Sequence, residues 1–251
     1  MYSPLRNSRV KLSLGHIFWR EVGRGPNLVF LHGSWDDGSQ WLRTIEHLSP
    51  DFQCFAPDLL GFGDSEHPNV NYSIALEVEC LAQYLDALNL QEVYLIGDSL
   101  GGWVAASYAI KYPDRVQGLV LLAPEGVNAG NQGGRWQTAS WLIAQPPLAY
   151  WLLRSIYPIA KLLQSPVAVQ LLFGRRRSEI TAELVDENLP LLKAPVLLLH
   201  GSEDTPAALS LCQSYAALAP NAELQSLSPG DSNLSQEVPD IVANYIRQFA
   251  N

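Results

Sequence analysis

The sequence predicts an α/β fold in which a mostly parallel central sheet is flanked by helices. Short apolar runs alternate with amphipathic stretches along the 251 residues, which is the pattern of strands and helices in alternation. The runs are nearly all apolar, as expected for strands that are buried on both faces of a sheet. No internal repeat or low-complexity linker interrupts the alternation, so we expect one core built around the sheet.

Five apolar runs and a further segment, Leu224–Leu227, supply the expected strands of the sheet. The five runs are Leu28–Leu31, Phe52–Ala56, Val93–Ile96, Leu119–Leu122 and Val196–Leu199. Ahead of them, the segment Val10–Val22 carries Gly15 near its middle. This segment predicts an antiparallel hairpin at one edge of the sheet.

Helices are expected where apolar residues recur at intervals of three and four. Behind Ser73, which has the residue type of an N-cap, the recurring residues are Ile74, Val78, Leu81, Leu85 and Leu88. A second helix is expected to begin at Ser99 and to end at Tyr112, before Pro113. The last expected helix runs from Pro239 to the C-terminus.

The composition and charge narrow the classes of function and the compartment. Hydrophobic residues make up 47% of the chain and charged residues 16%, which is typical of a globular protein. The formal net charge of −9 argues against nucleic-acid binding, because phosphate contacts need a basic face. Cys54, Cys80 and Cys212 are widely spaced, which indicates reduced, buried thiols. The N-terminal segment does not resemble a signal peptide, and no run of about 20 apolar residues is present. We therefore expect a soluble cytoplasmic protein.

The segment from Val93 to Gly102 carries the most informative motif. It reads Val-Tyr-Leu-Ile-Gly-Asp-Ser-Leu-Gly-Gly, which is a buried strand, then G-x-S-x-G, then the start of a helix. Glycine on either side of Ser99 lets neighbouring backbone segments approach a tight strand-to-helix turn. Such a turn exposes the serine hydroxyl and points the first amides of the helix at an oxyanion formed there. The motif therefore predicts that Ser99 is a nucleophile.

The order of motifs along the chain resembles the α/β-hydrolase superfamily. HGSWDDGSQW and PDLLGFGDSEHP come first, then GDSLGG, and PVLLLHGSEDTP comes last. The closest likeness is to the small, cofactor-free, lidded hydrolases, a group that includes C–C bond hydrolases, esterases and haloperoxidase-like proteins. The resemblance implies an α/β-hydrolase fold. No cofactor is expected, since the sequence shows neither a cluster of metal ligands nor a G-x-G-x-x-G turn that opens a helix.

The resemblance also implies an oxyanion hole beside Ser99. Its two N–H groups would come from Leu100 and from Ser34, in the loop after the first parallel strand. Two amides that converge on one point stabilise charge that develops only in the transition state. The neighbouring His32 is expected to hold this loop rather than to act as a base.

The acid of the expected triad follows the strand Val196–Leu199. The family's G-x-x-D pattern falls there on Asp204, whose alternative role is a helix N-cap. Glu125, which comes just after the preceding strand, is a weaker candidate, because some relatives place the acid at that point. Asp98, within the serine motif itself, is expected to point elsewhere. His200, at the strand end, is expected to pack in the core.

The base histidine is missing from its expected position. In the family it lies before the final helix, five residues ahead of an acidic residue and seven ahead of a proline. Here these are Glu237 and Pro239, which places the base at Ser232. Loss of the base lowers the turnover of a triad by about 10⁶-fold, with about 10³–10⁴-fold catalysis over water left. We therefore expect weak or absent ester hydrolysis, unless His67 or His32 from another loop, or a group of the substrate, supplies the base.

A long insertion between two strands is expected to form a helical cap. Residues 128–190 show no strand pattern and are rich in Trp, Tyr, Leu and Pro, which assigns residues 1–127 and 191–251 to the core. An apolar cap favours a hydrophobic substrate. The candidate substrate-binding residues are Trp35, Trp136, Trp141 and Trp151. Two alternatives remain for the aromatic residues of the cap: packing onto the core alone, and contact with a membrane surface through the basic residues beside them.

Two functions from different classes follow from these observations. The first is a hydrolase that cleaves a small or acyl-chain ester, or a related carbonyl bond, through Ser99. The second is a non-catalytic relative that uses the same pocket to bind an apolar ligand or a partner. A third possibility is a lyase of the same fold. The missing histidine is the sequence feature that separates the first two. A fluorophosphonate also separates them, because it would label an activated serine and would not label an idle one.

Overall fold

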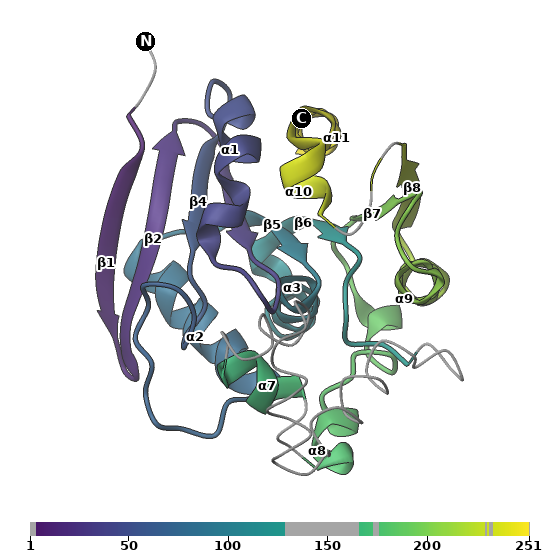
Figure 1. Ribbon diagram of the computed structural model, residues 1–251, viewed down its shortest axis with the longest axis horizontal. Coiled ribbons are helices and arrows are strands. Elements are labelled where there is room, and N and C mark those ends of the chain that lie inside the picture. Colours follow the sequence, from purple (N-terminus) through teal and green to yellow (C-terminus); the bar gives the residue numbers. More distant parts are fainter. Residues whose placement is uncertain (1–3, 129–165, 173–175, 229, 231–232, 251) are drawn as a thin grey trace, which may run out of the picture.

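A central sheet of eight strands organises the computed structural model, which describes residues 4–128, 166–172, 176–228, 230 and 233–250. The strand order is β1-β2-β4-β3-β5-β6-β7-β8. The strands are β1 (Arg6–Leu12), β2 (Gly15–Gly23), β3 (Asn27–Leu31), β4 (Gln53–Pro57), β5 (Val93–Asp98), β6 (Val116–Leu122), β7 (Val196–Gly201) and β8 (Ala222–Leu227). β2 pairs antiparallel with both β1 and β4, and the other pairings of these strands are parallel. The predicted edge hairpin and mostly parallel sheet are confirmed (Figure 1).

Helices cover both faces of this sheet (Figure 1). α1 (Leu42–Leu48) and α11 (Pro239–Ala250) pack on one face, and α2 (Ile74–Ala87), α3 (Leu100–Lys111) and α9 (Pro206–Leu218) pack on the other. Successive strand side chains point to opposite faces, so each inner strand contributes to two apolar layers. This double burial explains why the strand segments read as continuous apolar runs.

The N-terminus of α2 is capped both by a neighbouring side chain and by a side chain that is distant in the sequence. The Ser73 hydroxyl accepts from the Leu76 N–H at 3.1 Å, which confirms the expected N-cap. The Glu183 carboxylate, far along the chain, accepts from the N–H groups of Ile74 and Ala75 at 3.2 and 3.3 Å. Since the first four N–H groups of a helix have no partner within it, these contacts stabilise the N-terminus of α2.

The described part of residues 128–190 is helical. It contains α7 (Pro166–Leu172), α8 (Arg177–Ala182) and the 3₁₀ turn Leu189–Leu191, with no sheet strand among the residues described there. The Trp103 indole N–H donates to the Glu183 carbonyl oxygen at 3.0 Å, which fastens this region to α3. The division into a core and a separate cap stays a prediction, because residues 129–165 and 173–175 lie outside the described residues.

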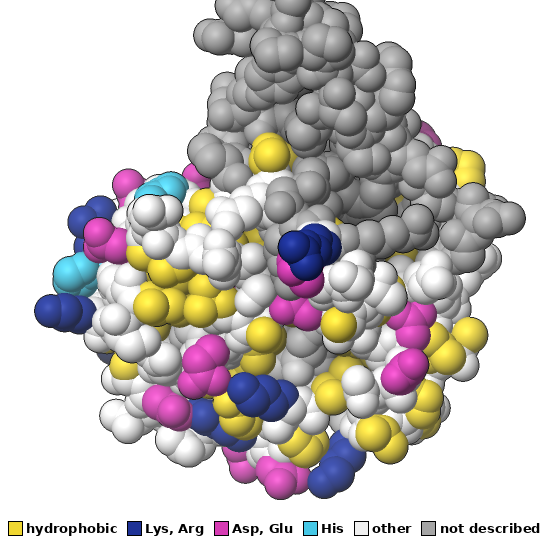
Figure 2. All heavy atoms as spheres, turned by 90° about the horizontal axis from the view of Figure 1, so that it is seen from below, with side chains coloured by type: hydrophobic (Ala, Val, Ile, Leu, Met, Phe, Trp, Pro, Cys, Tyr) yellow, Lys and Arg dark blue, Asp and Glu magenta, His cyan; other side chains and the backbone are white. Residues whose placement is uncertain are grey.

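The surface carries both charge signs. Figure 2 shows a face on which Lys and Arg side chains lie among Asp and Glu side chains and form no continuous basic area. Among the helices that the structure describes, none has the length and apolar character needed to cross a membrane.

Candidate active site

The turn at Ser99 has the geometry that its motif predicts. Ser99 lies between β5 and α3 with φ 49° and ψ −109°, a backbone conformation that residues other than glycine rarely adopt. A Cβ on Gly97 would lie 2.5 Å from the carbonyl oxygen of Gly101, and a Cβ on Gly101 would overlap the carbonyl oxygen of Leu31. Glycine at both positions therefore lets β5, α3 and β3 meet tightly around the serine.

Glu125 is the acidic residue that contacts Ser99. The Ser99 hydroxyl donates to Glu125 Oε1 at 2.7 Å, and the Glu125 N–H donates to the Ser99 carbonyl oxygen at 3.1 Å. Glu125 is buried, and its carbonyl oxygen accepts from the Tyr215 hydroxyl of α9 at 2.5 Å. The parallel pairing of β5 and β6 brings the two strand ends together. Sequence reasoning ranked Glu125 behind Asp204, since only this pairing reveals the contact.

The loop after β3 lies beside Ser99. A Cβ on Gly33 would lie 3.7 Å from the Ser99 Cβ, and the next residue, Ser34, is buried. Within the described part of the chain, neither the Ser34 N–H nor the Leu100 N–H has a hydrogen-bond acceptor. Both donors are thus available near the serine, and their convergence on one oxyanion stays a prediction.

His32 holds this loop through both ring nitrogens. The Leu59 N–H donates to His32 Nε2 at 3.0 Å, so the ring proton is on Nδ1, which donates to the Gly33 carbonyl oxygen at 2.8 Å. Burial lowers the pKa of His32 below its ordinary value and favours the neutral ring. Because C=O and N–H of a trans peptide point in opposite directions, the bond to Gly33 directs the Ser34 N–H away from this ring. The geometry agrees with a structural His32 and leaves it no free nitrogen to act as a base.

Neither of the remaining acidic candidates is hydrogen-bonded to the Ser99 hydroxyl in the described part of the chain. Asp98 Oδ2 accepts from Gln40 Nε2 at 2.5 Å, so Asp98 points elsewhere, as expected. Asp204 follows β7, and its Oδ1 accepts from the Thr205 N–H at 2.6 Å. The cap of α9 is Thr205 and not Asp204, because the Thr205 hydroxyl accepts from the helix. Asp204 as triad acid stays a prediction.

Asp204 and the neighbouring His200 have unused hydrogen-bonding capacity. Asp204 Oδ2 and both ring nitrogens of the buried His200 have no hydrogen-bond partner among the described residues. Burial lowers the pKa of His200, and the charge of Asp204 acts in the opposite direction. Ser232, the expected base position, lies outside the described residues.

Few of the expected substrate-binding residues can be placed. Trp35 is half-buried and packs against the larger apolar layer. Trp136, Trp141 and Trp151 lie outside the described residues. Exposed His67 Nε2 is hydrogen-bonded to the Gly63 carbonyl oxygen at 3.2 Å, and no hydrogen bond joins it to Ser99.

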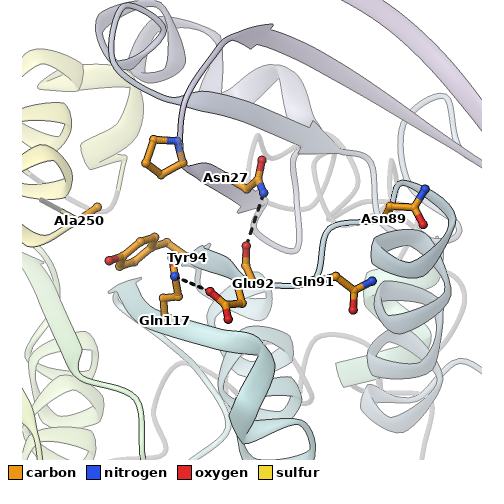
Figure 3. A pocket seen from close by; sticks show the side chains of 8 residues that line it. Asn27, Asn89, Gln91, Glu92, Tyr94, Gln117 and Ala250 are labelled. Atoms are coloured by element: carbon orange, nitrogen blue, oxygen red, sulfur yellow. Dashed lines mark hydrogen bonds between the residues drawn. The ribbon is translucent and has the colours of Figure 1, made fainter.

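A hollow of about 570 Å³ lies at the opposite edge of the sheet from Ser99 (Figure 3). Its lining includes Asn27, Glu92 and Gln117, which come from the amino ends of β3, β5 and β6. The Gln117 amide donates to Glu92 Oε2 at 2.9 Å, and Asn27 Nδ2 donates to the Glu92 carbonyl oxygen at 3.5 Å. This hollow is therefore separate from Ser99, which lies at the carboxyl edge of the sheet.

The described residues hold no group of three His, Cys, Asp or Glu side chains that could bind a metal ion. Cys54, Cys80 and Cys212 are free and buried. Among these residues, the groups placed for chemistry at Ser99 are therefore its own hydroxyl, the Glu125 carboxylate and the nearby backbone amides.

Comparison with known proteins agrees with this geometry. The family model described as alpha/beta hydrolase fold matches residues 26–156. A 2-hydroxy-6-oxo-2,4-heptadienoate hydrolase of Pseudomonas putida is 39% identical over 112 residues, which cover 43% of this chain and 41% of that protein. A haloalkane dehalogenase of Mesorhizobium japonicum is 37% identical over 98 residues, which cover 39% of this chain and 32% of that protein. The chain thus spans about a third to two fifths of the length of these curated relatives.

Solved structures match over nearly the whole chain. A thermophilic esterase from Thermogutta terrifontis superposes with a TM-score of 0.77 at 22% identity, and the match covers 98% of both chains. A serine hydrolase from a Cycloclasticus bacterium superposes with a TM-score of 0.79 at 22% identity, with the same coverage. At this identity the likeness shows the fold alone.

Proposed function

The chain belongs to the α/β-hydrolase fold family, whose model matches over half of its residues, and on this premise we propose that it is a slow serine hydrolase. Its relatives include proteins named as hydrolases. The proposed substrates are small or acyl-chain esters, or molecules with a related carbonyl bond, including the C–C bonds cleaved by some members of the group that the sequence resembles. Ser99 is the proposed nucleophile.

The observation that carries this proposal is the hydrogen bond from the Ser99 hydroxyl to Glu125 Oε1, at 2.7 Å. A nucleophilic serine needs a group that takes its proton, and Glu125 is already in contact with it. In the proposed reaction Ser99 Oγ attacks the carbonyl carbon while its proton passes to Glu125. The same proton then goes to the leaving group, and water releases the acyl group from Ser99 in the second half.

The backbone around Ser99 supports the same role. The negative oxygen of the tetrahedral intermediate would meet the N–H of Leu100, at the positive N-terminal end of α3. The Ser34 N–H would supply the second donor, from the loop that His32 holds. Removal of one such donor from a known hydrolase costs about 10²–10³-fold in kcat, so the two amides are a large part of the proposed rate enhancement.

Turnover is expected to be slow because a carboxylate is a poor substitute for histidine. In water a carboxylate is a weaker base than imidazole by about two pKa units, and proton transfer is fastest when the pKa of the base lies near the working pH. His32 is excluded by its two hydrogen bonds. We therefore propose turnover well below that of an ordinary esterase.

One observation favours a second candidate function, in which the pocket binds an apolar ligand or a partner without catalysis. All five histidines lie in described segments, and none of them is hydrogen-bonded to Ser99. In that case Glu125 would only hold Ser99 in place. The same fold and the same buried contacts would then serve binding alone.

The compartment and the partners follow as parts of the proposal. Three free, buried cysteines suit the reducing cytoplasm, where we place the protein. The acidic net charge of −9 disfavours nucleic acid. An apolar or acyl-bearing small molecule is the proposed ligand, and contact with a membrane surface through the aromatic cap is the less favoured alternative.

The test is hydrolysis of p-nitrophenyl esters of increasing chain length, with fluorophosphonate labelling as a second readout. We expect measurable turnover and labelling in the wild type, and the loss of both in Ser99→Ala. Ser232→His, which restores the family's base position, should raise kcat by at least about 10²-fold. Labelling and turnover that are equal in wild type and Ser99→Ala would overturn the enzyme proposal in favour of binding.

A further inference from the structure

A buried cluster centred on Gln40 joins three separate parts of the active-site edge. Gln40 lies in the 3₁₀ turn Gly38–Trp41 and is only 5% exposed. Its Oε1 accepts from the Gly33 N–H at 3.0 Å. Its Nε2 donates to Asp98 Oδ2 at 2.5 Å and to Ser235 Oγ at 3.1 Å. One side chain therefore contacts the loop after β3, the turn before Ser99 and α10 (Leu234–Glu237).

The three contacts determine the orientation of the Gln40 amide. Its carbonyl oxygen faces a backbone donor, and both hydrogens of its NH₂ group face oxygen acceptors. A flipped amide would place the NH₂ group against the Gly33 N–H and the oxygen against the Asp98 carboxylate, so two attractions would become two repulsions. The contact to Asp98 is assisted by charge, which makes it stronger than a bond between neutral groups.

The two ends of this amide bond to residues that are one and two positions along the chain from the two donors of the proposed oxyanion hole. Gly33 is adjacent to Ser34, whose N–H is one donor. Asp98 is two residues before Leu100, whose N–H is the other. A Cβ on Gly33 would lie 3.0 Å from Asp98 Oδ2, so the loop and the turn are already packed together at this point.

We infer that Gln40 is a positioning residue that holds the loop carrying the Ser34 N–H in register with the turn carrying the Leu100 N–H. This inference rests on the proposed function and deepens it, because it names what keeps the two donors at one geometry. A mismatch of about 1 Å between catalytic groups can cost about 10²-fold in rate. Ser235, the third contact, ties the same amide to the helix that follows residues 231–232.

Thr44 offers a matched control for Gln40. The Thr44 hydroxyl is also buried and donates to the Ser235 carbonyl oxygen at 3.1 Å. It bonds the same helix as Gln40 without a hydrogen bond to Gly33 or Asp98. Gln40→Leu and Thr44→Val thus each remove buried hydrogen bonds to α10, and only the first frees the oxyanion loop and the turn.

The first measurement is steady-state ester hydrolysis by wild type, Gln40→Leu and Thr44→Val. We expect Gln40→Leu to lower kcat by about 10–100-fold with KM within about twofold of wild type, because the donors act on the transition state. Thr44→Val should stay within about threefold in both constants. Equal losses of kcat in the two variants, or a change in KM alone, would overturn the inference.

Gln40→Glu adds a readout that a purely structural role would not change. This variant keeps an acceptor for the Gly33 N–H and places a second carboxylate against Asp98. Two carboxylates in contact share one proton when the pH is low enough, which restores a donor to Asp98. Relative to wild type at the same pH, we expect activity to recover at pH 5–6 and to fall at pH 8. A pH-independent ratio would count against the inference.

Amide hydrogen exchange separates failure of this inference from failure of the proposed function. Exchange at the Gly33 N–H should be at least about 10-fold faster in Gln40→Leu than in Thr44→Val. If the wild type shows no turnover that depends on Ser99, the enzyme proposal fails, and this exchange ratio still decides the role of Gln40. Equal exchange in the two variants would overturn the positioning role.

Discussion

The carboxyl ends of β3, β5 and β6 differ from the carboxyl end of β7 in how their buried polar groups are bonded. At the ends of β3, β5 and β6, Ser99 contacts Glu125, and both ring nitrogens of His32 are hydrogen-bonded. At β7, both nitrogens of His200 and the Oδ2 of Asp204 have no hydrogen-bond partner among the described residues. The described hydrogen bond of the Ser99 side chain is thus to Glu125, and Asp204 as triad acid stays a prediction.

This difference shows where the structure supports chemistry at Ser99. A pre-organised site holds its reacting groups before substrate arrives. In the described residues, only the carboxyl ends of β3, β5 and β6 meet that condition. A buried polar group without a partner costs about 1–3 kcal/mol. In the described residues this applies to His200 and Asp204 Oδ2 after β7, and also to the Ser34 hydroxyl in the loop beside Ser99. The predictions for Glu125, Asp204, His32 and His200 remove groups on either side of this comparison, and the one for Glu77 tests a buried carboxyl outside it.

The largest expected effect separates Glu125 from Asp204. Glu125→Gln removes the proposed proton acceptor and should lower kcat by about 10²–10⁴-fold. Asp204→Asn removes a carboxylate that does not contact Ser99 and should change kcat by less than about threefold. Steady-state kinetics on the best p-nitrophenyl ester measure both, with thermal melts to confirm that each variant is folded. The opposite ranking would identify Asp204 as the acid.

The next effect concerns Glu77, a buried carboxyl that is bonded on one side only. Its Oε2 accepts from the Leu60 N–H at 3.3 Å, and its Oε1 has no partner among the described residues. Burial raises the pKa of Glu77 to about 8. The folded state therefore keeps this proton up to about pH 8, whereas the unfolded chain releases it above its ordinary pKa of about 4.3.

Because the unfolded state binds fewer protons in this range, Glu77 makes the folded state less stable as the pH rises from 5 to 8. Glu77→Gln removes that dependence. The free energy of unfolding of wild type should fall relative to Glu77→Gln by about 3 kcal/mol over this range. Urea denaturation of both proteins at pH 5 and pH 8 measures the difference, in which the contributions of other titrating groups cancel. A constant difference would show that Glu77 is already ionised at pH 5.

A smaller effect is expected for His32. His32→Phe keeps an aromatic ring in a buried place but leaves the Leu59 N–H without its acceptor and the Gly33 carbonyl oxygen with the Asp36 N–H alone, at 3.3 Å. We expect a loss of about 2 kcal/mol in the free energy of unfolding, together with a loss of about 10-fold in kcat as the Ser34 N–H loses its orientation. Urea denaturation and ester kinetics on one preparation would give both values.

The smallest effect is expected for His200, which serves as the matched control. His200→Phe breaks no hydrogen bond of the described residues and removes a buried imidazole, so the free energy of unfolding should change by less than about 1 kcal/mol. Activity should stay within about twofold of wild type. A large loss of activity with a normal thermal melt would instead make His200 the missing base.

The sequence by itself determined the parts of this protein that depend on local patterns. Apolar runs marked the inner strands, because a strand buried on both faces has no polar positions to vary. The spacing of Gly97, Ser99 and Gly101 predicted the strained turn, since a Cβ at either glycine meets backbone atoms. Ser73 marked the start of α2 by residue type alone. α1 was not anticipated, and for α9 the sequence indicated only a start near Asp204, where the cap proved to be Thr205.

Only the tertiary structure decided which polar groups meet. Ser99 and Glu125 are 26 residues apart, and Gln40 and Ser235 are 195 residues apart. The first contact arises because β5 and β6 are neighbours in the sheet. The second arises because α10 packs against the 3₁₀ turn that holds Gln40. Periodicity reports which face a side chain takes but not which strand lies next to it. The sequence therefore pointed to Asp204, and the pairing of β5 with β6 placed Glu125 on the serine.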